Sequence, residues 1–429
     1  MIRMYFIFVF SCFLLTVAGQ GTSPDLAYYI EVARNYSPLL NDYRNQLQIE
    51  QAELQRLKAL YTRSRIELNG DYLFVPVITK DGGQTSFRWN AQDAIDYYGY
   101  DLGESSGHLH AGATWTQPLL EHSSYKVAQE LSGINIEITR NNIRIEENQL
   151  ERLVTEQYLL CLLDQTQIAF ADSIAAVLEH QQEIVRLFAD KGLAKQSDLH
   201  LLAIEREANA ELRLSSLQAY HTYLMDLNLL CGIDDTTDVA LTDTGLHLRL
   251  SLDRGSLFTE QYRLDSLNTA ASLRSFNLQY KPRLDLFVNG GMQTGSFSQW
   301  YRHFGWSAGL TFTWTLFDGR QKRWKERQAE LQQQSIRIYR DHAEYQRNMR
   351  LRQCLSELEK YDRREEALEK QLAEYECVLS DYAREITAGQ VSVLDYITVL
   401  RNRIQTEKDC LLLRTNRQLV IATYNYWNH

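Results

Sequence analysis

Two segments in the first half of the sequence each match a segment in the second half, and both matches have the same offset. The segment AGATWTQPLLEH aligns with AGLTFTWTLFDG, which places Gly112 on Gly309 at an offset of 197 residues (309 minus 112). Farther along, KGLAKQSD aligns with AGQVSVLD, which places Gly192 on Gly389 at the same offset. A constant offset over so long a stretch indicates a tandem duplication. The chain is therefore expected to use one structural unit twice.

The duplicated segments begin with strands that have one apolar and one polar face. In GLTFTWTLFDGR, Leu310, Phe312 and Trp314 alternate with threonines, which is the period of a β-strand. The segments RIELNGDYLF, HLHAGATWTQPL and RLDLFVN alternate in the same way. We therefore predict two β-hairpins, over residues 65–119 and 283–317. The Gly-rich stretch ITKDGGQTSFRWNAQDAIDYYGYDLGESSG inside the first hairpin is expected to be an exposed loop.

Each hairpin leads into a long segment of helical pattern. The whole chain has five prolines, and residues 121–190 contain no proline and a single glycine, Gly133. Because proline and glycine end helices, long uninterrupted helices are predicted here and over residues 321–386. The segments DKGLAKQSD and TAGQVSVLD interrupt them. In the first interruption, Gly192 is placed to end one helix and Ser197 or Asp198 to start the next. Asp318 is placed to cap the start of the second long helix.

These patterns divide the chain into four parts. Residues 1–19 are predicted to be a secretory signal peptide, because one Arg precedes an apolar run and small residues follow. A signal anchor that stays attached is the alternative. The first repeat covers residues 20–231, an irregular connection covers 232–256, and the second repeat covers 257–429.

Composition excludes several classes of protein. Charged residues make up 23% of the chain, and no mature segment is expected to be a lipid-spanning helix of about 20 apolar residues. The net charge of -10 without basic runs argues against a nucleic-acid partner. The five cysteines after the signal show no metal-binding spacing and are expected to be free and mostly buried. Cys12 lies inside the apolar run, which argues against lipidation.

The strands have the length needed to cross a bilayer, about ten residues when tilted. Four strands cannot close a barrel, so several copies would contribute; two copies give eight strands and three give twelve. A soluble four-stranded sheet packed on the helices is the alternative. In a barrel, the side chains facing a water-filled lumen would be those of Arg65, Glu67, Asp71, His108, His110, Asp285, Asn289, Thr311 and Thr313. Those facing lipid or its interface would be Tyr72, Trp115, Trp306, Leu310, Phe312 and Trp314.

One predicted strand carries two histidines that could belong to a metal site. His108 and His110 are two residues apart, as zinc ligands can be, but no third ligand is evident in the sequence. Pore-lining polar residues are the favoured interpretation, and no metal is expected.

The chain resembles the TolC-like outer-membrane efflux protein family over essentially all of its mature length. The segments that carry the resemblance are YIEVARNYSPLL, GLTFTWTLFDGR and ITAGQVSVLDYITVLRNRIQ, in this order. The resemblance implies an α+β membrane protein: a homotrimer with a twelve-stranded β-barrel in the outer membrane, four strands per protomer, continued by a long α-helical coiled-coil barrel in the periplasm. It also implies a passive export channel for small molecules, metals or proteins. Its partners would be a periplasmic adaptor (membrane fusion) protein and an inner-membrane RND or ABC transporter.

The resemblance further implies a channel gate at the two helix interruptions. Asp198 and Asp395 match acidic residues that the family places near the periplasmic constriction. The chain departs from the family pattern at Thr398, where a second acidic residue can occur, and at Val391, where a gating Arg is expected. A helix cap beside Ser197 is the alternative role for Asp198, whereas Asp395 follows a better cap at Ser392.

An enzyme is not expected. The sequence contains no G-x-S-x-G, P-loop, dinucleotide-binding glycine pattern or H-E-x-x-H motif, and no cofactor is implied. A periplasmic helical scaffold whose hairpins form a soluble sheet remains the alternative to the channel.

Overall fold

The structure is a computed structural model, and it describes most of the chain. The described residues are 24–72, 77–81, 83–88, 109–192, 194–249, 256–294, 304–387 and 390–429. The predicted signal peptide, His108 and Gly389 lie outside these ranges.

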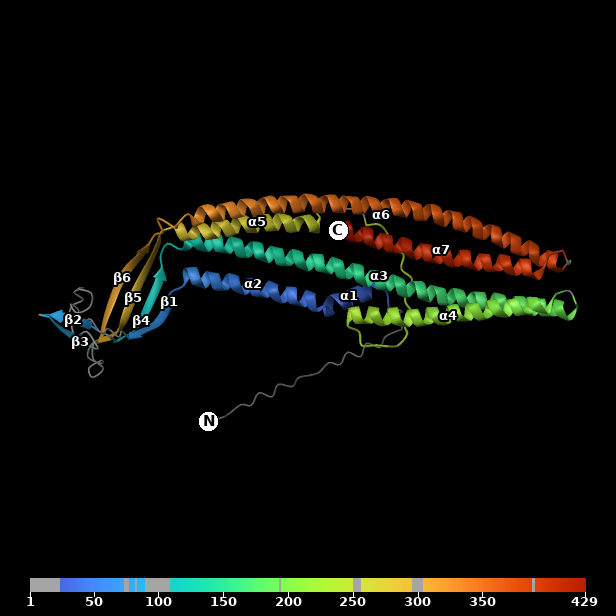
Figure 1. Cartoon of the computed structure of the whole chain (residues 1–429), viewed down its shortest axis with the longest axis horizontal. Helices are drawn as coiled ribbons and strands as arrows, with labels where there is room; N and C mark the ends of the chain where they lie inside the picture. Colours follow the sequence, from blue (N-terminus) through green and yellow to red (C-terminus); the bar gives the residue numbers. More distant parts are fainter. Residues whose placement is uncertain are drawn as a thin grey trace, which may run out of the picture. The chain divides into compact units, whose positions relative to one another are not determined.

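The chain contains two series of helices and strands, and each ends in two long helices (Figure 1). The first series is α1 (Leu26–Tyr36), α2 (Pro38–Thr62), β1 (Arg65–Tyr72), β2 (Val77–Asp81), β3 (Gln84–Arg88), β4 (Leu109–Pro118), α3 (His122–Asp190) and α4 (Gln196–Cys231). The second is α5 (Leu257–Asn277), the 3₁₀ turn η2 (Leu278–Tyr280), β5 (Arg283–Thr294), β6 (Phe304–Thr313), α6 (Gln321–Thr387) and α7 (Val393–Trp427). The predicted repeat boundaries at residues 231 and 257 stay predictions.

Local chemistry explains where the helices begin and end. Asp25 caps α1 by accepting the backbone N–H of Tyr28 at 2.9 Å. Proline at the first position of α2 is compatible with a helix start, because that N–H has no partner inside the helix. Gly232 ends α4 in the left-handed conformation, with φ 68°. These boundaries were predictable from the sequence.

The strands form a four-stranded antiparallel sheet in the order β1-β4-β5-β6. Glu67 lies opposite Thr114, Thr114 opposite Asn289, and Asn289 opposite Ser307. Since side chains alternate between the two faces of a strand, this register places the polar positions of all four strands on one face.

Two predictions about local structure were wrong. Part of the expected loop forms a separate hairpin, because β2 pairs with β3. Its residues are mainly polar, so they lack the apolar alternation that marked the other strands. The strand predicted from GLTFTWTLFDGR also stops earlier than expected, at Thr313, although the apolar alternation in the sequence continues to Leu316.

The described residues form two compact units, each with segments from both halves of the chain. Unit 1 comprises the described residues within Met1–Pro38, Glu147–Leu252 and Asn348–His429. Unit 2 comprises those within Leu39–Glu146 and Asp253–Arg347. In unit 2, Arg274 of α5 pairs with Glu130 of α3 at 2.6 Å, and Ser266 donates to Gln333 of α6 at 2.7 Å. These contacts hold three helices together beside the sheet-forming segments.

Unit 1 has a core in which Tyr158, Cys161 and Cys231 are almost fully buried. Cys161, Cys231, Cys354 and Cys410 are free and buried, whereas Cys377 is free and exposed, which confirms the prediction for the cysteines. Helix α3 is long and apolar enough, in one 18-residue stretch, to cross a membrane by length and composition alone. This stretch departs from the expectation that no mature segment is apolar enough to span lipid; helices in the core of a bundle have the same character.

The connection after α4 runs as an extended segment that side chains hold in place. Tyr158 donates to the Thr242 carbonyl at 2.6 Å, and Gln165 accepts the Leu241 backbone N–H at 2.7 Å. From α7, Gln418 accepts the Leu246 N–H at 2.9 Å, and Asn425 accepts the Arg249 N–H at 2.8 Å. This segment, residues 239–249, has no strand partner, so these side chains satisfy its backbone.

Candidate functional site

The apolar face of the sheet is exposed in the described chain. Leu68 of β1 is 85% exposed, and Phe304, Trp306, Leu310 and Phe312 of β6 are 61–78% exposed. Trp115 shares this face, because it lies opposite Ile66 and Val288 in the register. Soluble antiparallel sheets bury one face against a core, and this one leaves its apolar face open.

The opposite face of the sheet carries the predicted polar residues. Asn289 donates to Thr114 across the strands at 2.8 Å, and Arg65 pairs with Glu67 on the same strand at 3.2 Å. Asp285 lies opposite Thr311, and Arg283 opposite Thr313. Phe287 is an apolar exception on this face, where its ring lies against Gly309.

Three predicted residues lie at the end of the sheet away from the helices. Asp71 lies opposite His110, and Tyr72 opposite Leu109, in the β1–β4 register. His108 falls outside the described residues, so the paired-histidine alternative is not tested at that position. Among the described residues, no group of three or more His, Cys, Asp or Glu is placed to hold a metal ion.

A hollow of about 310 Å³ lies where the polar face meets the helices. Five charged side chains line it: Arg63, Arg65, Glu121, Arg283 and Asp285. The Arg283 Nε atom is 3.9 Å from the Glu121 carboxylate. Burial raises the pKa of Glu121, and the nearby Arg283 partly opposes this shift.

Close backbone packing occurs between β4 and β5. A Cβ atom added at Gly291 would lie 2.5 Å from the Ala111 carbonyl oxygen and 2.5 Å from the Gly112 Cα. A Cβ atom at the neighbouring Gly290 would meet no atom within 4 Å. The two strands can approach at this point only because Gly291 has no side chain.

In the segment between β6 and α6, the Asp318 side chain caps the start of the helix. The Asp318 carboxylate accepts the backbone N–H groups of Arg320 and Lys322, each at 2.8 Å, and the hydroxyl of Tyr280. Gly319 and Arg320 both adopt the left-handed conformation, with φ 65° and 71°. The cap predicted at Asp318 is confirmed, and Arg320 occupies a conformation that non-glycine residues rarely adopt.

Asp198 lies in the first turn of α4, in unit 1. The helix begins at Gln196, two residues before this aspartate, so the expected start at Ser197 or Asp198 was wrong. The Asp198 carboxylate accepts the Lys195 backbone N–H at 3.1 Å and the Ser197 hydroxyl at 3.4 Å. Asp198 therefore stabilises the helix start, which leaves its proposed role in a gate untested.

Asp395 has the equivalent position in α7. Ser392 caps this helix as predicted, because its hydroxyl accepts the backbone N–H groups of Leu394 at 3.1 Å and Asp395 at 3.4 Å. The Asp395 side chain is exposed. Thr398, one turn later, donates its hydroxyl to the Leu394 carbonyl at 2.8 Å. Among the described residues, no hydrogen bond or ion pair joins Asp198 to Asp395.

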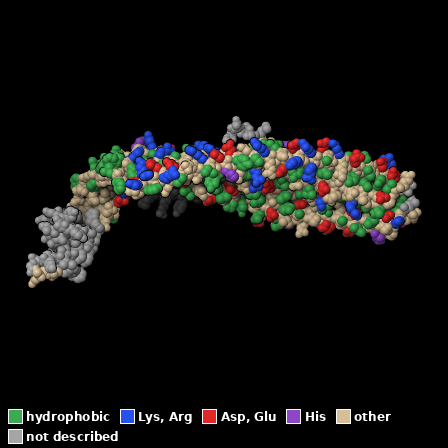
Figure 2. Space-filling model, turned by 45° about the horizontal axis from the view of Figure 1, so that its top comes forward, with side chains coloured by type: hydrophobic (Ala, Val, Ile, Leu, Met, Phe, Trp, Pro, Cys, Tyr) green, Lys and Arg blue, Asp and Glu red, His purple; other side chains and the backbone are tan. Residues whose placement is uncertain are grey.

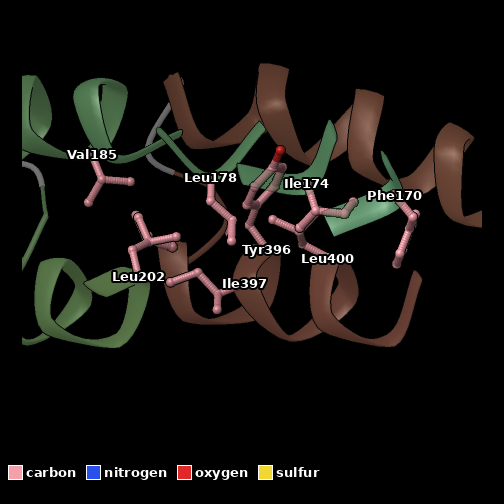
Figure 3. Close-up of a cluster of buried hydrophobic side chains, with 9 residues drawn as sticks. Phe170, Ile174, Leu178, Val185, Leu202, Tyr396, Ile397 and Leu400 are labelled. Atoms are coloured by element: carbon pink, nitrogen blue, oxygen red, sulfur yellow. The ribbon is translucent and has the colours of Figure 1, made fainter. Parts of the chain in front are cut away.

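Behind these two helix starts lies an apolar cluster (Figure 3). Nine buried side chains form it, from three helices: Phe170, Ile174, Leu178 and Val185 of α3, Leu202 of α4, and Val393, Tyr396, Ile397 and Leu400 of α7. Leu379, Tyr382 and Ile386 of α6 pack against it, so four helices lie side by side in unit 1 (Figure 1). The cluster fixes how the first turns of α4 and α7 lie relative to each other.

An ion pair that was not predicted from the sequence joins α4 and α7 beside this cluster. Arg401 of α7 donates both its Nε and an NH₂ group to Glu205 of α4, with the Nε distance at 2.8 Å. The Glu205 side chain is only 17% exposed. The partners are 196 residues apart in sequence, and neither stands in a recognisable motif.

A second buried carboxylate lies in the middle of α3. Asp164 is 7% exposed, and its Oδ2 atom has no hydrogen-bond partner among the described residues. Burial raises its pKa to about 6.

No family model matches the chain, and no curated protein sequence matches it. Solved structures of outer-membrane channels do resemble it closely. CusC, whose structures concern folding and transmembrane channel formation, has a TM-score of 0.72 and 14% identity, covering 96% of this chain and 95% of that chain. VceC, an outer membrane protein of Vibrio cholerae, has a TM-score of 0.70 and 13% identity, covering 94% and 95%.

The CmeC outer membrane channel of Campylobacter jejuni has a TM-score of 0.68 and 11% identity, covering 95% of this chain and 86% of that chain. These identities are low, but the similarity extends over nearly the whole of each chain. The chain therefore has the fold of the outer-membrane channels, as its resemblance to the TolC-like family implied.

Proposed function

We propose that the chain is one protomer of an export channel in the bacterial outer membrane, extending into the periplasm. The observation that carries the proposal is the four-stranded sheet, which has an exposed apolar face and a polar opposite face. The apolar face fits lipid, and the polar face fits a water-filled pore. The likeness in fold to CusC, VceC and CmeC supports the same function.

The two edges of the sheet support assembly into a closed barrel. Strands β1 and β6 each have one neighbour within the sheet, so their outer edges are open. Open edges are unfavourable in lipid, where backbone groups find no water. Three protomers, contributing four strands each, would close a twelve-stranded barrel. The repeated order of elements supports a tandem duplication, with each half contributing one hairpin.

In this assembly, the polar face would line the pore, with Arg65, Glu67, Asp285, Asn289 and the β6 threonines toward water. Asp198 and Asp395 would lie at the periplasmic end of the helices. Three copies of each would form a ring of carboxylates that attracts cations and responds to pH. The chain would act as a passive conduit without chemistry of its own. A periplasmic adaptor and an inner-membrane transporter of the RND or ABC type would supply substrate and energy.

Charge substitutions on the two faces of β6 test the proposal. We expect Leu310→Arg or Phe312→Arg to prevent assembly in the outer membrane, at about 2–4 kcal/mol for a charge near the bilayer midplane. Thr311→Arg lies between them on the polar face and serves as the matched control, which should assemble. Recovery of Leu310→Arg as a soluble, normally folded protein would favour a periplasmic scaffold with a soluble sheet.

Planar-bilayer recordings test the acidic rings separately. Asp198→Ala and Asp395→Ala should reduce cation preference and flatten the pH response of the conductance, because each removes three carboxylates from the trimer. Asp172→Ala, which removes the α3 partner of an exposed ion pair with Arg213 of α4, is the control and should change neither. Unchanged conductance, cation preference and pH response in both test variants would rule out the proposed gate.

A further inference from the structure

The segment after β6 presents apolar side chains that continue the exposed face of the sheet. Trp314, Leu316 and Phe317 are 54%, 78% and 83% exposed. Trp314 is nevertheless fixed, because its indole N–H donates to the Tyr280 carbonyl at 3.2 Å. Tryptophan with a satisfied N–H and an exposed ring is typical of the boundary between lipid and water.

The first turns of α6 add a dense group of cations to this segment. They are Arg320, which directly precedes the helix, and Lys322, Arg323 and Lys325. Trp324, which is 65% exposed, lies among them. The Lys322 ammonium lies 5.7 Å from the centre of the Tyr280 ring, and the Lys325 ammonium lies 5.9 Å from that of Phe276. Lys and Arg side chains gather beside apolar ones where the helices of unit 2 adjoin its sheet (Figure 2).

These four cations have no carboxylate partner within 4.0 Å among the residues that the structure describes. Two acidic groups lie close to them along the chain. Asp318 is occupied by backbone N–H groups and the Tyr280 hydroxyl. Glu326, the residue after Lys325, makes no ion pair with any of the four among the described residues. Arg327, which follows, differs from them because it pairs with Glu330 at 2.9 Å. Cations in the first turn of a helix interact unfavourably with the helix dipole, so these side chains do not stabilise α6.

The matching junction of the first half lacks this charge. At the offset of 197, Arg320, Lys322 and Lys325 correspond to Ser123, Tyr125 and Ala128, and only Arg323 has a cationic counterpart, Lys126. The apolar part is shared, since Leu119 and Leu120 are 47% and 53% exposed. The positive charge is therefore a property of the second junction rather than of strand-to-helix connections in general.

We propose that residues 314–325 form a binding surface for anionic phospholipids in the periplasmic leaflet of the outer membrane. The inference rests on the proposed function, which places the apolar face of the sheet in that membrane. Along this segment, the end of a strand comes first, then exposed aromatic side chains, then cations. In a leaflet, the acyl chains, the interface and the head groups follow each other in the same order. The charge of the four side chains complements the phosphate of an anionic lipid, while Trp314, Leu316 and Phe317 contact its glycerol and upper acyl region.

The test compares lipid binding by the full-length protein in mixed micelles of phosphatidylethanolamine and phosphatidylglycerol, measured by native mass spectrometry. The variant R320Q/K322Q/R323Q/K325Q should lose at least about a tenfold preference for phosphatidylglycerol. The variant R337Q/R340Q/R350Q/R352Q removes the same number of cations farther along α6 and should keep the preference. The exchanged variant R320K/K322R/R323K/K325R should keep it as well.

The result that would overturn the inference is an unchanged preference in the first variant, or an equal loss in the α6 control. Competition by inorganic phosphate, at the concentration of the lipid phosphate, would identify a small-anion site and overturn it too. Conductance measured in bilayers of phosphatidylethanolamine alone distinguishes failure of the lipid-binding proposal from failure of the proposed channel function. If both variants conduct there but bind lipids alike, only the lipid surface is wrong; if the wild-type chain never enters a bilayer, both proposals fail.

Discussion

The hydroxyl of Tyr280 donates a hydrogen bond to the carboxylate of Asp318, so the turn that ends α5 is tied to the cap that begins α6. This hydrogen bond, together with the two backbone N–H groups at the cap, holds the pKa of Asp318 below its usual range. A carboxyl with a lowered pKa stabilises the folded state when ionised. The contribution is present at neutral pH and is lost as the pH falls through the pKa of the folded state.

Removing this cap should therefore destabilise the protein in a pH-dependent way. We expect Asp318→Ala to lower the thermal unfolding midpoint at pH 7, Tyr280→Phe to lower it less, and both differences to shrink below about pH 4. Asp341→Ala, which removes an exposed carboxylate paired with its neighbour Arg340, is the control. A loss for Asp318→Ala that is the same at pH 7 and in acid would contradict an ionised cap.

Substitutions at two adjacent glycines should have very different effects. Gly291→Ala places a Cβ atom against the backbone of β4, and we expect a loss of about 1–3 kcal/mol in the free energy of unfolding. Gly290→Ala enters open space and should change the free energy of unfolding by less than about 0.5 kcal/mol. Chemical denaturation in detergent measures both. Equal losses would mean that β4 and β5 are not paired in the observed register.

The pair between Arg401 and Glu205 should contribute more than the exposed ion pairs of the helices. Arg401→Ala leaves a mostly buried carboxylate without its partner, and we expect a loss of about 1–3 kcal/mol. Arg363→Ala, which removes a cation from the exposed pair with Glu359, should cost less than about 0.5 kcal/mol. A double-mutant cycle with Glu205→Gln isolates the interaction energy. A coupling energy near zero would show that the two side chains do not act together.

Asp164 should destabilise the protein above its pKa. Because burial raises the pKa to about 6, the folded state prefers the protonated form, and stability falls as the pH rises from about 4 through 6. Asp164→Asn should therefore increase the free energy of unfolding by about 1–3 kcal/mol at pH 8 and by much less at pH 4.5. Asp172→Asn, at an exposed position, is the control. The same gain at both pH values would exclude titration of Asp164 as the cause.

Features with a strong local period were predictable from the sequence. The alternation around Leu310 and Thr311 placed those residues on opposite faces of the strand, and the register agrees. The caps at Asp318 and Ser392 were also predictable, because each depends on chemistry within a few residues.

Other features depend on contacts or contexts that local patterns do not encode. The β2–β3 hairpin was missed because its residues lack an apolar face. The start of α4 was misplaced because the Asp198 side chain reaches back to Lys195, and a lysine gives no sign of a cap position. The contact between Glu205 and Arg401 arises only when two distant helices pack together. The order of the strands likewise came from the structure, whereas their faces came from the sequence.

The side chains that hold the extended segment 239–249 make its ordering depend on two distant parts of the chain. Tyr158 and Gln165 precede the segment in the sequence and bind its first part. Its second part depends on Gln418, which is 172 residues farther along, and on Asn425. Until α7 is in place, the backbone N–H groups of Leu246 and Arg249 lack these two partners. The segment between the two halves of the chain can thus be fully ordered only when the last helix has joined the bundle.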